Sequence, residues 1–218
     1  MTTPVDLRNR FPGASNNWAR FDGPAGTQMV DAAIRAMSDF AAGGSNANTG
    51  GYFSSANDCD ALLDRTRQVV GTLFGADPEG ICFGANMTTM TMAFTRAVAR
   101  TLKPGDRVVG TKLDHDANVS PWRIACELSG AEHMLAPFST TTFMLDTEAM
   151  LNMITPNTKW VAITGASNLL GTAPDLKPII DAAHDVGARV FVDAVHLAVH
   201  RPIDIAQLGC DVLATSPY

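Results

Sequence analysis

The stretch that most constrains the fold is Ala188–His196, in which a short apolar run leads into an acid. The run Val190–Val192 is mostly β-branched, which is typical of a strand buried on both faces of a parallel sheet. The carboxylate of Asp193 cannot lie inside such a strand without a partner, because an unpaired charge in a dry interior costs too much free energy. We therefore expect Asp193 at the carboxyl end of the strand, where open α/β sheets bind their ligands.

Much of the chain alternates short apolar runs with helical segments, which predicts an α/β fold with a mostly parallel sheet flanked by helices. We expect strands at residues 81–83, 107–109, 133–135, 160–164, 190–192 and 212–214. We expect helices at about residues 28–41, 58–74, 87–102, 121–128, 147–154 and 175–186. Residues 1–27 are punctuated by Gly and Pro, so they are expected to form an irregular arm before one large domain over residues 28–218.

Composition narrows the classes of function. The 218 residues carry a formal net charge of −6 and no run rich in Lys and Arg, which argues against nucleic acid as a partner. No apolar stretch has the length of a membrane span, and the N-terminus lacks the features of a signal peptide, so we expect a cytoplasmic protein. The cysteines have no metal-binding spacing and are expected to be reduced thiols, with Cys82 and Cys210 in the core; the four are Cys59, Cys82, Cys126 and Cys210.

Polar residues follow five of the expected strands, which end at Phe83, Val109, Thr164, Val192 and Ala214. Each polar residue alone could cap a helix or shape a turn. Together, on one edge of one sheet, they predict a single site for an anionic ligand with an aromatic ring. The carboxylate of Asp193 suits a positive ring nitrogen such as the pyridinium of pyridoxal phosphate, although an aspartate that caps the next turn is the alternative.

The individual motifs leave several interpretations open. Gly84–Thr89 joins a strand to a helix, where free N–H groups and threonine hydroxyls form either an anion site or a simple cap. His115 lies between two aspartates and could be a metal ligand, a general base, a ring stacked on a flat ligand or an exposed loop residue. In Ser167–Thr172 the amide of Asn168 could hold a ligand oxygen or shape the turn.

The order and spacing of these motifs resemble the class V aminotransferase family of fold-type I enzymes, especially the cysteine desulfurase and selenocysteine lyase-like branch. The resemblance runs from Phe21–Gly26 to Ser216–Tyr218. It implies that residues 28–218 are the large domain that binds pyridoxal 5′-phosphate, in a homodimer that acts on a cysteine-like amino acid. The reaction it favours is cleavage of a C–S bond through an external aldimine, with a sulfur-acceptor protein as a possible partner. An aminotransferase, an epimerase, a kynureninase-like lyase and a non-catalytic scaffold are the alternatives.

Carried over by position, the resemblance assigns the catalytic roles to His115 and Asp193. Asp193 would pair with the pyridinium nitrogen, and His115, in the family's E-H-x-A pattern, would stack on the ring. Asn168, in the S-N-x-x-G pattern, and His196 would hydrogen-bond the phenolic oxygen. Many relatives have glutamine in place of His196.

The same resemblance implies that Thr88, the backbone N–H of Met87 and Ser216 hold the phosphate, and that Tyr218 belongs to the cofactor site. This phosphate turn departs from the family's usual Gly-Thr-Thr-Glu, and Tyr218 stands where desulfurases usually have histidine. The family's Schiff-base lysine directly follows the position of Tyr218. We therefore expect the native protein to continue with that lysine and a C-terminal domain.

Overall fold

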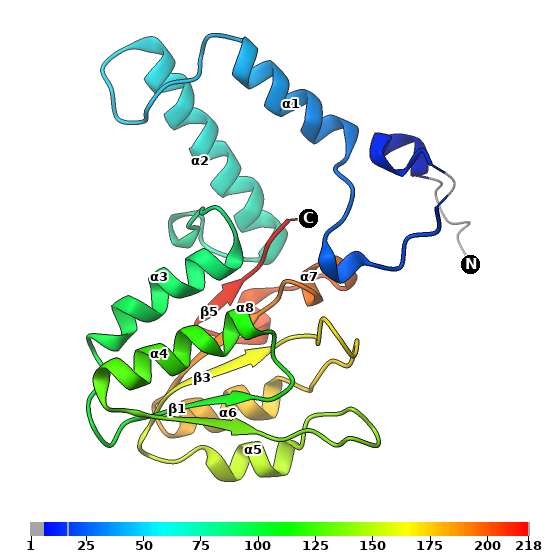
Figure 1. Ribbon diagram of the computed structural model, residues 1–218. Helices are drawn as coiled ribbons and strands as arrows, with labels where there is room; N and C mark the ends of the chain where they lie inside the picture. Colours follow the sequence, from blue (N-terminus) through cyan, green and yellow to red (C-terminus); the bar gives the residue numbers. More distant parts are fainter. Residues whose placement is uncertain (1–6, 17, 218) are drawn as a thin grey trace. The chain divides into compact units, whose positions relative to one another are not determined.

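The computed structural model describes residues 7–16 and 18–217 (Figure 1), and the chain divides into two compact units. The first unit ends at Gly71, and the second unit is Thr72–Pro217. The boundary predicted after residue 27 stays a prediction. Tyr218, one of the expected cofactor-binding residues, lies outside the described part of the chain.

The first unit contains helix α1 (Asp31–Ala42) and most of helix α2 (Ser54–Phe74), both at predicted positions. Short 3-10 turns at Arg8–Arg10, Pro12–Ala14 and Gly23–Ala25 make up the irregular arm before them. The thiol of Cys59 on α2 donates a hydrogen bond to the carbonyl of Ser45 at 3.1 Å and accepts one from the N–H of Ala47 at 3.3 Å. These two bonds fasten the loop between the helices to α2.

The second unit is built on a parallel five-stranded sheet with the strand order β2-β1-β3-β4-β5. Its strands are β1 (Arg107–Thr111), β2 (Glu132–Ala136), β3 (Thr158–Thr164), β4 (Arg189–Asp193) and β5 (Val212–Ala214). All five contain the strands expected at these places, so the predicted α/β fold with a parallel sheet is confirmed.

Helices cover both faces of this sheet (Figure 1). They are α3 (Met87–Ala99), α4 (Ser120–Ser129), α5 (Thr147–Met153), α6 (Lys177–Asp185), α7 (Leu197–His200) and α8 (Ile205–Leu208). The first four are at expected positions. Helices α7 and α8 are single turns that the sequence analysis did not predict, since a four-residue segment shows no helical periodicity.

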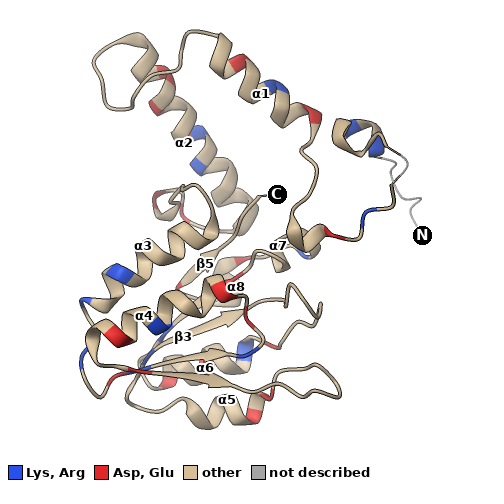
Figure 2. Ribbon diagram, in the orientation of Figure 1, with Lys and Arg blue, Asp and Glu red and all other residues tan. Residues whose placement is uncertain are grey.

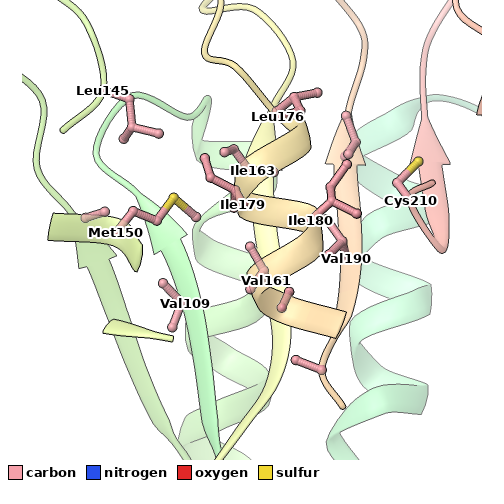
Figure 3. Packing of buried hydrophobic residues seen from close by; sticks show 14 of the residues in the cluster. Val109, Leu145, Met150, Val161, Ile163, Leu176, Ile179, Ile180, Val190 and Cys210 are labelled. Atoms are coloured by element: carbon pink, nitrogen blue, oxygen red, sulfur yellow. The ribbon is translucent and has the colours of Figure 1, made fainter. Parts of the chain in front are cut away.

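The two faces of the sheet have separate hydrophobic cores, because successive residues of a strand point in opposite directions. One core packs the strands against α5 and α6 (Figure 3), through side chains that include Val109, Val161, Ile163, Val190, Met150, Ile179 and Ile180. The other packs them against α3 and α4, through Val108, Trp160, Ala162, Phe191, Val98, Trp122 and Cys126. Burial on both faces explains why the central strands are apolar without alternation.

The strand expected at residues 81–83 is not formed, and Cys82 is exposed instead of lying in the core. The N–H of Ile81 bonds to the carbonyl of Pro78 in a 3-10 turn, and Phe83 is 45% exposed. The described residues offer this segment no neighbouring strand, and an apolar run without a ladder partner has nothing to hold it extended. The other cysteine expected in the core, Cys210, is buried as predicted.

Charged residues are scattered over helices and loops, and strand β3 is mostly free of them (Figure 2). Among the described residues, no helix combines the length and the apolar character that crossing a membrane requires.

Candidate active site

The strand order identifies the carboxyl ends of β1 and β3 as the place on the sheet where a ligand is expected to bind. The connection after β1 passes through α4 to β2, whereas the connection after β3 passes through α6 to β4 on the other side. The connections after β1 and β3 therefore cross opposite faces of the sheet, and in open α/β sheets ligands bind at the carboxyl ends of the strands where this change occurs. The hydroxyl of Ser167 donates a hydrogen bond to the carbonyl of Leu113 at 3.3 Å and joins the two loops.

Asp193 is the last residue of β4, as the sequence predicts, and is only 5% exposed. The N–H of Val195 donates to its Oδ1 at 3.0 Å, and no described residue donates to Oδ2. Burial raises the pKa of Asp193, while the Val195 N–H and the positive charge of His115 oppose that rise. A carboxylate that is desolvated and only half satisfied is suited to a cationic N–H donor.

His115 interacts electrostatically with both Asp193 and His196, which follows Asp193 by three positions. His115 is exposed, and its positive charge lowers the pKa of both Asp193 and His196. Burial lowers the pKa of His196, with further lowering from the charges of His200 and His115. His196 is therefore a neutral hydrogen-bonding group at physiological pH.

The amino end of α3 forms a second pole of the site. Asn86 caps the helix by accepting from the N–H of Thr89 at 2.8 Å, and the N–H of Met87 donates to the hydroxyl of Ser216 at 3.1 Å. Thr88 is exposed, and no described residue accepts from its N–H. The structure thus brings Met87 and Ser216 together across 129 positions of sequence, at a helix end whose dipole favours an anion.

Asn168 is half-buried in the turn after β3 but is not joined to the other expected residues. Its neighbour Ser167 closes this turn, since the Ser167 N–H donates to the carbonyl of Thr172 at 2.8 Å and its Oγ accepts from the N–H of Leu170 at 3.3 Å. No described group bonds to the amide of Asn168.

A polar network that was not expected from the sequence adjoins His115 in the turn after β1. Asp114 accepts hydrogen bonds from the hydroxyl of Thr111 and from Asn118 Nδ2, the latter at 2.8 Å. The indole N–H of Trp122 in turn donates to Asn118 Oδ1 at 3.1 Å. No helical spacing could have revealed Asp114, because it lies in a bend before the 3-10 turn Asp116–Asn118 and helix α4.

These residues suit a ligand that carries a phosphate at one end and a protonated ring nitrogen at the other. The phosphate pole is the helix end with Met87 and Ser216, and the cationic pole is the half-satisfied carboxylate of Asp193. The imidazole of His115 is a flat group on which an aromatic ring can stack, and nearby polar side chains can hydrogen-bond the substituents of such a ring.

Comparison with known proteins defines the class. The aminotransferase class-V profile matches residues 20–217, so the chain belongs to that family. A probable cysteine desulfurase of Mycolicibacterium paratuberculosis is 34% identical over 201 residues, which are 91% of this chain and 29% of that protein. The aminotransferase-like protein FGM3 of Gibberella zeae is 30% identical over 218 residues, covering 98% of this chain and 54% of that protein.

The fold agrees with this class. The crystal structure of the cysteine desulfurase CsdA from Escherichia coli matches with a TM-score of 0.86 and 27% identity, over 99% of this chain and 54% of that one. The chain thus spans about half, or less, of the length of these relatives. The family and the fold indicate pyridoxal phosphate as the cofactor, as the sequence predicts.

Proposed function

We propose that this chain provides the cofactor-binding part of an enzyme that cleaves the C–S bond of cysteine or a similar amino acid. The observation that carries this proposal is Asp193, a buried carboxylate with one oxygen free of described donors, at the carboxyl end of β4 beside His115. The relatives that are named cysteine desulfurases support the choice of reaction.

Pyridoxal phosphate, when bound, draws electrons from the α-carbon of an attached amino acid. The role proposed for Asp193 is to accept a hydrogen bond from the ring nitrogen and keep that nitrogen protonated. His115 would cover one face of the ring and exclude water from it. His196, which is neutral, and Asn168 would hydrogen-bond the phenolic oxygen.

For the phosphate we propose Thr88, the N–H of Met87 and the hydroxyl of Ser216. The free N–H and hydroxyl of Thr88 would donate directly, and the hydroxyl of Ser216, which already accepts from Met87, can donate its own proton. The role of Tyr218 and the lysine expected after it remain predictions, as do a homodimer and a sulfur-acceptor protein.

The cofactor assignment is tested by titrating the protein with pyridoxal phosphate and recording its visible absorbance before and after borohydride reduction. The wild type should gain a band that reduction abolishes, with the cofactor fixed to a lysine. Asp193→Asn should weaken binding by about tenfold or more, because a neutral amide cannot hold the positive ring nitrogen. Asp185→Asn, which changes an exposed aspartate on α6, is the matched control and should bind like the wild type.

The reaction is tested by incubating the loaded protein with cysteine and a thiol reductant. Release of alanine and sulfide in equal amounts would support desulfuration. The similarity to an aminotransferase-like protein favours transamination as the second candidate, which would instead consume a keto acid and release no sulfide. Absence of both reactions in a protein that binds the cofactor would overturn the proposed activity.

A further inference from the structure

In the turn between β1 and α4, exposed His115 takes part in two hydrogen bonds, one through its ring and one through its carbonyl. The N–H of Ala117 donates to Nδ1 of the imidazole at 3.1 Å, and the carbonyl of His115 accepts from the N–H of Asn118 at 2.8 Å. A ring nitrogen that accepts a hydrogen bond carries no proton, so neutral His115 holds its proton on Nε2. The turn therefore selects both the orientation and the tautomer of this ring.

The shape of the turn depends on the residue before His115. Asp114 is bonded on one oxygen by the hydroxyl of Thr111, the last residue of β1, and on the other by Asn118 Nδ2 at 2.8 Å. Asn118 is 1% exposed and is bonded at 3.1 Å by Trp122, a fully buried residue of α4. Both ends of the turn are thus tied, through one carboxyl group, to rigid elements of the core.

We propose that Asp114 is a positioning residue: with Thr111, Asn118 and Trp122 it fixes the turn that presents His115 to the cofactor beside Asp193. This inference rests on the function proposed above, since it gives a purpose to the orientation of His115. Asp114 does not touch the cofactor in this proposal and acts through His115 alone.

Electrostatics agree with this geometry. Burial, and to a smaller extent the charge of Asp193, raises the pKa of Asp114 to about 8, against the hydrogen bonds from Thr111 and Asn118. A raised pKa favours the neutral form of this carboxyl group. The isosteric change Asp114→Asn is neutral at every pH and keeps one acceptor oxygen.

The test combines four variants. Asp114→Leu removes both acceptors, and Thr111→Val is a milder change that deletes one of the two donors. Asp114→Asn is the conservative variant. Asp116→Ala is the matched control, because that aspartate directly follows His115, is exposed, and its carboxylate accepts a hydrogen bond from the hydroxyl of Ser120 instead of from Thr111 or Asn118.

The first readout is the affinity for pyridoxal phosphate, measured in the wild type and in a His115→Ala background. When His115 is present, Asp114→Leu should weaken binding by about tenfold and Thr111→Val by about threefold; when His115 is absent, each should weaken it by less than about twofold. Asp114→Asn and Asp116→Ala should bind like the wild type. Equal weakening in both backgrounds would overturn the inference, because Asp114 would then act without His115.

The second readout needs no cofactor. Nitrogen NMR of the His115 ring, assigned against His115→Ala, should show Nδ1 unprotonated and Nε2 protonated in the neutral wild type and a mixture of tautomers in Thr111→Val. Unchanged ring signals in Thr111→Val and Asp114→Leu would overturn the inference. If the wild type binds no pyridoxal phosphate, the proposed function fails, and the ring signals still decide whether Asp114 positions His115.

Discussion

The two units of the chain differ sharply in how they bury their apolar residues. In the described part of the first unit only Ala56 and Cys59 are buried apolar residues, and helix α1 buries none of its residues. In the second unit the sheet is enclosed on both faces, and Val161, Ile163, Val190 and other side chains are fully buried.

This difference shows what a helical pattern can and cannot guarantee. Met29, Ile34 and Met37 have the spacing of an amphipathic face, yet Met29 lies before α1 begins and the three are 47%, 43% and 62% exposed. The spacing correctly predicted that this segment is a helix. It did not predict whether the apolar side of the helix would be buried. A parallel sheet, in contrast, creates its own two cores as soon as helices cross over it.

The comparison is tested most strongly by the paired substitutions Ile163→Ala and Ile34→Ala. Ile163 is fully buried in β3, so its truncation should lower the free energy of unfolding of the second unit by about 2–5 kcal/mol. Ile34 on α1 is 43% exposed and belongs to neither hydrophobic core, so its truncation should change stability by about 1 kcal/mol or less.

The measurement is denaturant unfolding followed by tryptophan fluorescence. Trp122 and Trp160 are buried in the second unit and should dominate the change in signal, because Trp18 of the first unit is already 78% exposed in the folded protein. Circular dichroism would detect a separate transition of the helices in the first unit. A similar loss of stability in both variants would show that Ile34 is buried in the protein in solution and would remove the contrast between the units.

A second prediction compares thiols from the two units. Cys59 is buried in the first unit, whereas Cys126 and Cys210 are buried in the second, where desolvation raises the pKa of each to about 11. Exposed Cys82 should react with an alkylating reagent at once, and Cys59 should become reactive at lower denaturant than Cys126 and Cys210 because fewer apolar contacts protect it. Peptide mass spectrometry after timed alkylation gives the order.

Simultaneous labelling of Cys59, Cys126 and Cys210 would mean that the two units unfold together. The variant Cys82→Ser serves as the control, since it removes the fast reaction and should leave the other three rates unchanged.

The sheet was predictable because each strand carries its own signal. Val190–Val192 is apolar on both faces, and Asp193 marks its end because a lone carboxylate cannot be buried within it. The run Ile81–Phe83 has a similar apolar composition but no partner strand in the described structure. Its local sequence therefore predicted a strand that does not form. A strand depends on neighbours that may be distant in sequence, and composition does not reveal whether they are present.

The sequence predicted the individual residues of the candidate site better than the hydrogen bonds that join them. The positions of His115, Asp193 and Ser216 at strand ends followed from the alternation of strands and helices. The bond between Met87 and Ser216 joins residues far apart in the chain, and it exists only because β5 ends near α3. The network of Asp114 was overlooked because its members resemble ordinary turn and core residues until the fold places them in contact.

Packing in the second unit is less complete at the edge strand β2 than at the central strands. Nε2 of His133 on β2 is buried without a partner in the part of the chain that the structure describes. Burial, and then the positive charge of Arg123, lowers the pKa of His133 in the folded state. Since the unfolded chain has its ordinary pKa of about 6.5, it binds more protons than the folded protein below that pH.

The sign of the linkage is therefore that acid destabilises the second unit through His133. Stability should be unaffected by this residue above about pH 6.5 and should fall as the pH drops from there towards the lowered pKa of the folded state. His133→Leu should remove this part of the pH dependence, and Arg123→Gln should reduce it without abolishing it. Urea midpoints at several pH values between 5 and 8 would show this, on the order of 1 kcal/mol or less. Parallel pH profiles of the wild type and His133→Leu would mean that water or another group reaches Nε2, so that the core at β2 is more open than at β3 and β4.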